Sequence, residues 1–515
     1  MGKLLTAGLI ISLMLPSLIE ASPAPFDISD DEVNRFIERL SVKGLIDLHT
    51  NTLPLRSDEV LEILSDLKRR LREGEIELTS VERGILERIT RSIPALEGEG
   101  ERFGFDPAFE AAIGEGGSGR YLSVSARPAL FGAIGENVSF FSGFKWGVLS
   151  GRENYPALPG ERVYATGDLW QVSSVIAYLN LRLSRSLLLT AGRRWMWWGP
   201  GRFGSLILSH NSGPKDMIGL ELRTRRIRFV SFTSVLKSKM GNKRLSGHRL
   251  ELMPFGWARL GIHELVLYTD RFEIGYMNPV TVYFISQPLT EYGVRVTGPG
   301  KGYSADNLMI GGDLSLRLLG SLEVYGELMI DDFQPQEGLK GLKNWDSKYG
   351  LLLGAFWADP FGVENADIRA EYAFVNQWAY THESGILAYT DRDRVIGHPM
   401  GNDADSLMIE LSYYPSPTLL TGLRYCLTRK GETEVYDIHP EKGPEEWEFL
   451  SGVPEVRHEL ELSLAVLKPV WRGRISCGVY LLRNPDHKEG ESEGGLRLAL
   501  ALWTTRWPGV NGSEE

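Results

Sequence analysis

The stretch GGLRLALALW, residues 494–503, decides the fold because its side chains alternate with a period of two. Leucine occupies every second position from Leu496 to Leu502, with Arg497 and two alanines between the leucines. Successive side chains of a β-strand point to opposite faces, so this pattern gives one apolar face and one mixed face. A strand of this kind fits a wall that has lipid on one side and a polar lumen on the other.

The same alternation recurs from about residue 118 to residue 507. Examples are YLSVSARPALFGAI (121–134), DLSLRLLGSLEVYGELMI (313–330) and SLMIELSYYP (406–415). A soluble β-sandwich also alternates, but rarely across about 390 residues without a change of domain. With about 20 residues for a strand and its share of loop, this length predicts roughly 16–18 strands. We therefore expect an all-β transmembrane barrel of about 16–18 antiparallel strands over residues 118–507, followed by a polar C-terminal tail at 508–515.

Aromatic residues gather near the predicted strand ends. Trp357 stands beside an Asp-Pro turn, Tyr413 and Tyr414 precede Pro415, and three tryptophans fall within residues 195–198. Transmembrane barrels carry aromatic girdles at both membrane interfaces. We expect these residues to belong to such girdles.

The N-terminus has the pattern of a secretory signal. Lys3 precedes an apolar run from Leu4 to Leu15, and Ala21 is suited to cleavage. Residues 1–21 therefore predict a signal peptide, with a short buried helix as the alternative.

A helical period follows the signal. Residues 29–32 and 79–82 have the composition of capping boxes, and apolar residues recur behind both at helical spacing. We expect residues 22–117 to form a small periplasmic helical region. Its charged faces are solvated surface or, alternatively, a surface for a partner.

Composition narrows the functions further. The 515 residues carry a net charge of −11, and a nucleic-acid binder would show a basic patch, so we expect no nucleic-acid partner. The two cysteines, Cys426 and Cys477, lie in strand-like segments, and we expect them to be free and buried. No His-x-x-x-His or Cys-x-x-Cys spacing occurs, so we expect no metal and no cofactor.

Residues 192–214, GRRWMWWGPGRFGSLILSHNSGP, are the densest group of functional residue types. We expect a strand that ends in tryptophans, a tight turn at 199–201 and a second strand over SLILS, 205–209. Tryptophan faces stack on sugar rings, and guanidinium groups bind carboxylates with two hydrogen bonds, which suits an acidic polysaccharide. The candidate polysaccharide-binding residues are Arg193, Arg194, Trp195, Trp197, Trp198, Arg202, His210 and Asn211.

The residues of this stretch also have a structural and an enzymatic interpretation. The arginines can instead form a structural ladder with lumenal acids such as Asp216 or Glu221. Ser209 and His210 suggest an esterase, but neighbouring residues of a strand point to opposite faces, and no Gly-x-Ser-x-Gly turn is present. We therefore expect no catalytic residue and no enzyme.

The block at 192–214 resembles the signature of the Wzi family of capsule-assembly outer-membrane proteins. Further similarity lies at 51–64, at 324–327 with 331–333, and at 397–401. The resemblance implies a barrel of about 18 strands with a periplasmic helical part. It also implies a lectin-like role in attaching or organising capsular or other surface polysaccharide.

These observations give one leading hypothesis and two alternatives. We expect a monomeric barrel in the bacterial outer membrane whose partners are membrane lipid and a surface polysaccharide. A porin-like solute channel is the first alternative, and an outer-membrane hydrolase is the second.

Overall fold

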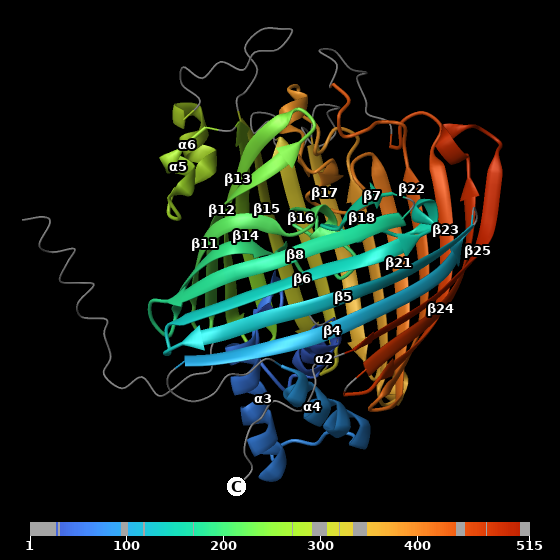
Figure 1. Cartoon of the computed structure of the whole chain (residues 1–515). Coiled ribbons are helices and arrows are strands. Elements are labelled where there is room, and N and C mark those ends of the chain that lie inside the picture. The colour runs from blue at the N-terminus through green and yellow to red at the C-terminus, as the bar shows by residue number, and fades with distance from the viewer. Residues whose placement is uncertain are drawn as a thin grey trace, which may run out of the picture.

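The computed structural model describes residues 27–28, 31–93, 101–116, 119–167, 169–269, 271–290, 306–318, 320–332, 348–438, 449–469 and 471–504. Within them, 18 antiparallel strands close into a barrel (Figure 1). The predicted fold class is therefore confirmed. The predicted signal peptide and C-terminal tail lie outside the described residues.

The strands follow one another around the ring in chain order, and the ring closes where the last strand pairs with the first. A short additional strand, β7 (Arg162–Thr166), pairs with β8. The barrel strands are β4 (Glu101–Gly116), β5 (Gly119–Ile134), β6 (Val138–Ser150), β8 (Leu169–Arg182), β9 (Leu187–Arg194), β11 (Lys215–Arg223), β12 (Ile227–Ser238), β13 (Gly241–Phe255), β14 (Ala258–Thr269), β15 (Asp306–Leu318), β16 (Leu322–Asp332), β17 (Lys348–Ala358), β18 (Ala366–Val375), β21 (Ala404–Ser416), β22 (Leu419–Lys430), β23 (Glu455–Leu467), β24 (Trp471–Arg483) and β25 (Ser492–Thr504).

The alternation in β25 has the predicted consequence. Leu496, Leu498 and Leu502 are exposed on the outer wall, while Arg497 points inward and contacts Glu459 of β23. Large apolar side chains are exposed in the same way on most of the other strands. This outer surface has the composition that a barrel wall in lipid requires.

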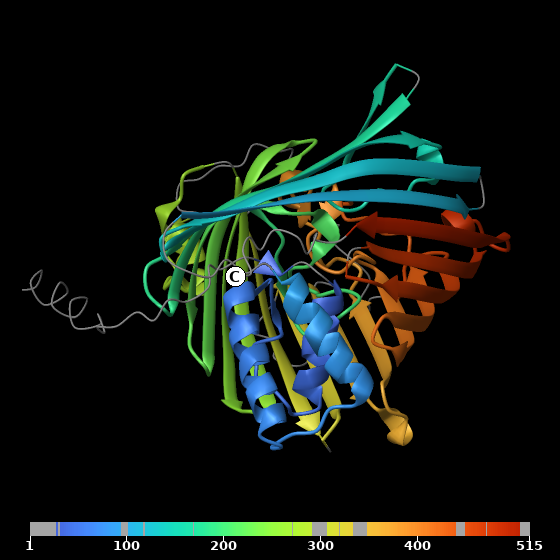
Figure 2. The ribbon, with the colours of Figure 1, turned by 60° about the horizontal axis from the view of Figure 1, so that its bottom comes forward.

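Three helices form a bundle at one mouth of the barrel, here called the bundle end; the opposite end is the loop end. They are α2 (Asp31–Val42), α3 (Ser57–Arg72) and α4 (Ser80–Ser92). The predicted capping box at Thr79 and Glu82 has both of its hydrogen bonds. Figure 2 brings the bundle end forward and shows the helices lying across the mouth. Among the described residues, no helix has the length and apolarity needed to cross a bilayer.

The bundle is fixed to the barrel rim by buried ion pairs. Arg39 of α2 contacts Asp359 and Asp367 at the turn between β17 and β18, and also Glu82 of α4. Glu32 is paired with Arg88 of α4 and with Arg472 of β24. Because these pairs join the helices to strands far apart in the ring, the bundle has a defined position in the mouth.

Two long connections at the loop end fold back into the lumen. Residues 195–214 join β9 to β11, and residues 376–403 join β18 to β21. They meet inside the barrel, where the Tyr389 hydroxyl donates to the Ile207 carbonyl at 2.7 Å and the Ser209 amide donates to the Ile396 carbonyl at 3.0 Å. The lumen beside β11–β18 is therefore filled by an apolar core.

Several boundaries differ from the sequence predictions. The barrel begins at Glu101 and not at 118, because β4 pairs with β5 and its apolar residues already alternate, with Phe103, Phe105 and Phe109 exposed on one face. Residues 205–209 form no barrel strand; their three consecutive apolar side chains are all buried inside the lumen. Both cysteines are free, but Cys477 is exposed and Cys426 is only partly buried.

The aromatic residues divide into two groups. Tyr413 is exposed near the bundle end of the wall, and Trp357 packs against Phe361 with ring centroids 4.7 Å apart. The girdle prediction was wrong for the tryptophans of residues 195–198, because their segment enters the lumen and does not stay in the wall.

Candidate functional site

The Trp-rich segment pairs with the N-terminal part of the chain inside the barrel. Its short strand β10 (Trp197–Trp198) pairs with β2 (Thr52–Leu53), and Trp198 also forms a bridge with Leu208. Residues that are 144 positions apart, Leu53 and Trp197, are thus paired in the lumen. Residues 195–214 from the loop end and the N-terminal residues around β2 from the bundle end together form a plug in the lumen.

Two glutamates on the barrel wall hold the backbone of this segment. Glu327 of β16 accepts hydrogen bonds from the Ser205 hydroxyl and the Leu206 amide, each at 3.0 Å. Glu371 of β18 accepts from the amides of Arg202 and Phe203 at 2.7 and 3.1 Å. These carboxylates satisfy main-chain donors that would otherwise be buried without a partner.

Glycine is required where this segment passes close to other groups. A Cβ atom on Gly204 would lie 2.1 Å from the His398 ring, and one on Gly201 would lie 2.0 Å from the Gly204 carbonyl oxygen. The turn can therefore pack against the second inward connection only with glycine at these positions.

The tryptophans and His210 form two different environments. Trp198 has no exposed surface and packs edge-on against Phe232. Trp195 and Trp197 are half-buried, with ring centroids 5.0 and 5.2 Å from the His210 ring. Burial, followed by the charges of Arg202 and Lys215, lowers the pKa of His210 to about 4. His210 is therefore neutral at physiological pH.

The serine, histidine and asparagine have separate structural partners. The Ser209 hydroxyl donates to the Gly397 carbonyl at 2.6 Å, and the Asn211 side chain donates to the Val395 carbonyl at 2.9 Å. His210 lies between Trp195 and Trp197, in tilted and edge-on ring contact. Ser209 and Asn211 therefore bind the second inward connection, whereas His210 packs within its own connection.

Each predicted arginine is paired with an acid of the protein. Arg193 binds Asp216 through two guanidinium nitrogens, at 2.7 and 2.5 Å. Met217 next to Asp216 belongs to the lumenal core and Ile218 is exposed, so this pair lies on the outer face of the wall and not on the lumenal face that the structural alternative predicted. Arg194 is buried and contacts Asp27 at 2.8 Å. Arg202 contacts Asp31 at the start of α2.

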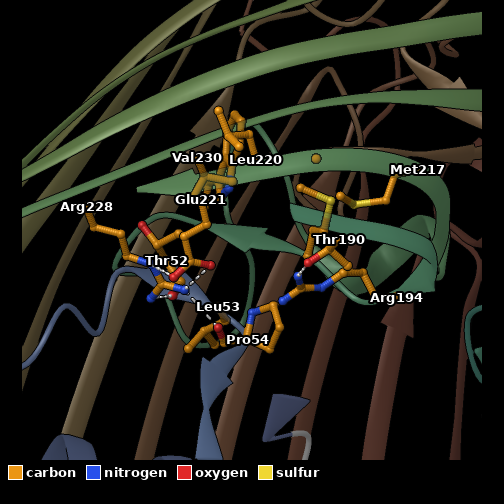
Figure 3. Close-up of a pocket in the computed structure, with 13 residues that line it drawn as sticks. Thr52, Leu53, Pro54, Thr190, Arg194, Met217, Leu220, Glu221, Arg228 and Val230 are labelled. Atoms are coloured by element: carbon orange, nitrogen blue, oxygen red, sulfur yellow. Dashed lines mark hydrogen bonds and ion pairs between the residues drawn. The ribbon is translucent and has the colours of Figure 1, made fainter. Parts of the chain in front are cut away.

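A buried charge network behind the plug was not found from the sequence. Arg249 of β13 binds Asp313 of β15 and donates to the Thr52 hydroxyl at 2.7 Å. Arg228 donates to the Thr52 and Pro54 carbonyls at 2.7 and 3.0 Å, as Figure 3 shows beside a small pocket. The pocket has a volume of about 20 Å³, enough for one water molecule. These arginines fix the N-terminal segment to the wall.

The other side of the lumen is open. A cavity of about 1050 Å³ lies inside the wall formed by β21–β25 and β4–β5. Its lining includes Glu115 and Tyr121 beside the loop-end turn of β4–β5, Asn154 and Tyr155 of the next connection, and Glu493. The cavity therefore extends to the loop end of the barrel.

Aromatic and charged groups alternate on the cavity wall. The Tyr480 ring lies 4.7 Å from the Arg497 guanidinium and 5.5 Å from that of Arg457. Arg497 pairs with Glu459 at 2.7 Å, and Arg424 pairs with Glu461 at 2.9 Å. Such a surface offers both donors and acceptors to a polar ligand. The only sequence signal was the inward position of Arg497 in the alternation of residues 494–503.

Comparison with known proteins gives the family. A sequence model described as "Capsule assembly protein Wzi" matches residues 176–481, which is more than half of the chain. The chain belongs to the Wzi family. A comparison with curated protein sequences found no match.

Two solved structures are similar to this Wzi-family chain, and the first shares its fold. One is Wzi of Escherichia coli, described as an outer-membrane protein involved in group 1 capsule assembly and as a carbohydrate-binding β-barrel. Its TM-score is 0.60 at 15% identity, over 94% of this chain and 99% of that chain. OpdK of Pseudomonas aeruginosa has a TM-score of 0.45 at 11% identity, over 79% of this chain and 99% of that chain.

Membership of the Wzi family and the apolar outer wall place this chain in the bacterial outer membrane. The structure brings seven of the eight predicted residues together in and around the plug, whereas Arg193 faces the outer side of the wall. A contact of these residues with polysaccharide stays a prediction, and for Trp198 it would require the packed core to open.

Proposed function

We propose that this Wzi-family barrel binds a surface polysaccharide at its loop end and organises it without chemical conversion. Membership of the capsule-assembly family supports the proposal, and so does the carbohydrate binding described for the E. coli protein. The bundle end then faces the periplasm and the loop end faces the cell surface. We further propose that the chain acts as a monomer.

The observation that carries the proposal is the open cavity beside β22–β25. Its volume of about 1050 Å³ is large enough for several sugar units. Tyr121 and Tyr155 offer aromatic edges and faces, while Arg424 and Arg497 offer guanidinium donors. The lining also carries more carboxylates than guanidinium groups, so a neutral glycan, whose hydroxyls can both donate and accept hydrogen bonds, is the favoured ligand. The carboxylates are Glu115, Glu153, Glu459, Glu461 and Glu493.

Calorimetric titration of the purified barrel in detergent tests this proposal. We expect neutral dextran to bind more tightly than the polyanion polygalacturonate, which the glutamates of the lining repel. Arg497→Ala should weaken dextran binding about tenfold, the loss expected for one charge-assisted hydrogen bond. Glu459 keeps its pairing with Arg457 in this variant, so the wall remains folded.

Arg127→Ala is the matched control. Arg127 is also paired with a glutamate and its side chain is 51% exposed, against 50% for Arg497, but it does not line the cavity. Equal affinities for the two variants would contradict the proposed site. A tenfold loss in the double variant Arg193→Ala with Arg202→Ala would instead make the Trp-rich segment a direct glycan contact.

A further inference from the structure

One connection at the loop end folds outward and not into the lumen. Residues 271–290 follow β14 and contain two short helices, α5 (Ile274–Met277) and α6 (Tyr283–Thr290). In Figure 1 they lie outside the barrel, beside the upper parts of β12–β15. Contacts with all four of these strands agree with this position.

The wall beneath the helices is polar. Leu265 and Leu267 of β14 belong to the lumenal core, so the residues that alternate with them, including Glu264 and Tyr268, face outward. Glu264 contacts His248 of β13 at 3.2 Å. This outer surface, at membrane depth on the strands, would place charged groups against lipid if it were bare.

The polar groups of the helical segment point toward that wall. The Tyr276 hydroxyl donates to Asp306 at 2.6 Å, and the Tyr283 amide donates to Glu264 at 2.7 Å. The Tyr283 ring packs on His248, with centroids 4.5 Å apart. The segment therefore supplies the hydrogen bonds that the outward-facing polar residues need.

The opposite side of the segment is apolar and exposed. Val280 is 82% exposed, Phe272 72% and Ile285 69%, and Ile274 and Phe284 are also exposed. A helix on a water-soluble protein buries its apolar side and exposes its polar side. Here the buried side holds the packed and hydrogen-bonded Tyr276 and Tyr283, while most of the large apolar groups are on the exposed side, where only a lipid solvent would accommodate them.

We propose that the outer face of residues 271–287 lies in the acyl-chain region of the membrane's outer leaflet. Its apolar surface is continuous with the lipid-facing wall, where Ile262 of β14 and Leu314 of β15 are exposed next to it. The segment thus converts a polar part of the barrel wall into a lipid-facing one. Its exposed side carries several large apolar groups, so replacing one of them should not remove the segment from the lipid.

Spin labelling in vesicles tests the proposal. The background is Cys426→Ser with Cys477→Ser, and single labels are attached to Val280→Cys and Ile285→Cys in phosphatidylcholine vesicles. Accessibility to oxygen, which concentrates in lipid, is compared with accessibility to a water-soluble nickel chelate. Ile262→Cys supplies the lipid reference, and Glu62→Cys, exposed on α3, supplies the aqueous reference.

We expect both helical labels to match Ile262→Cys, with oxygen accessibility several-fold above nickel accessibility. Labels that match Glu62→Cys would overturn the proposal by placing the segment in water. Labels shielded from both reagents would also overturn it, because another protein surface, including a second copy of this chain, would then cover the segment. The two exposed positions report independently, so poor folding of one variant does not remove the test.

Discussion

Glu327 shows how one carboxylate can shape a long connection inside a barrel. It is buried on β16 and accepts hydrogen bonds from Ser205, Leu206 and, at 3.3 Å, Ile207. These donors belong to residues 205–207, which are not part of a β-strand. A single wall residue therefore replaces the neighbouring strand that this backbone would otherwise need.

Removing this carboxylate should loosen the plug. Glu327→Ala leaves the buried amides of Leu206 and Ile207 without an acceptor, and we expect a loss of about 2–4 kcal/mol in the free energy of unfolding. Urea unfolding of the detergent-solubilised protein measures it. Glu327→Gln, which keeps one acceptor oxygen, should lose less, and Glu364→Ala in the exposed β17–β18 turn should lose nothing. Equal stability of Glu327→Ala and the parent would contradict this role.

The buried histidines of the plug should make stability depend on pH. Burial lowers the pKa of His398 to about 4, and burial followed by Arg202 and Lys215 does the same for His210. Because the ordinary value is 6.5, the unfolded chain takes up protons between pH 6.5 and 4 that the folded chain does not. Stability is therefore complete above pH 6.5 and falls as the pH decreases to about 4.

His210→Gln isolates this contribution from that of the carboxylates. The variant should lose about 1–2 kcal/mol less than the parent between pH 7 and pH 4.5, measured from unfolding midpoints. His487→Gln, in the turn between β24 and β25, is the control and should follow the parent. A His210→Gln variant with the parent's pH profile would show that His210 accepts a proton without disturbing the plug.

At the scale of elements, the bundle depends on a few buried ion pairs. Arg39→Ala leaves the buried Asp367 without its cation, while Lys43 remains beside Asp359 and Glu82, and breaking a buried pair in this way costs about 3–5 kcal/mol. We expect amide hydrogen exchange in α2 and α4 to accelerate at least tenfold. Arg69→Ala removes an arginine that pairs only at the exposed surface of α3 and should change nothing. Equal protection in both variants would show that apolar packing alone holds the bundle.

The regular elements follow from local patterns in the sequence. The alternation of residues 494–503 and the capping box at Thr79 predict β25 and the start of α4, because period and capping are properties of neighbouring residues. The inward path of residues 195–214 could not be predicted in this way. It depends on partners such as Glu327 and Thr52, which lie more than 100 positions away.

The candidate site was predicted only in part. The sequence suggested the pairing of Arg193 with Asp216 but placed it in the lumen, and it did not indicate the cavity around Tyr480. Arg457, Tyr480 and Arg497 come from three strands and meet through register. A shift of one residue in any of these strands would turn its Arg457, Tyr480 or Arg497 side chain to the outer wall. The register between strands cannot be predicted from the sequence of one strand alone.

At the scale of the whole molecule, the filled half of the lumen predicts poor conduction. The plug occupies the side next to β11–β18, and the bundle lies across one mouth. In planar bilayers we expect no stable conductance steps of the size that an open porin of equal strand number gives. Glu327→Ala should raise the frequency of brief openings. Large, steady steps from the parent protein would instead support the channel alternative.

The position of the closing seam has a consequence for the order of assembly. β25 and β4, which close the ring, both line the open cavity, while the plug packs against β11–β18 on the other side. The strands that surround the plug can therefore enclose the N-terminal segment while the wall is still an open sheet. Closure then requires only six residue pairs between Leu498–Trp503 and Glu110–Glu115. The final step of folding can thus take place without disturbing the core already formed on the far side.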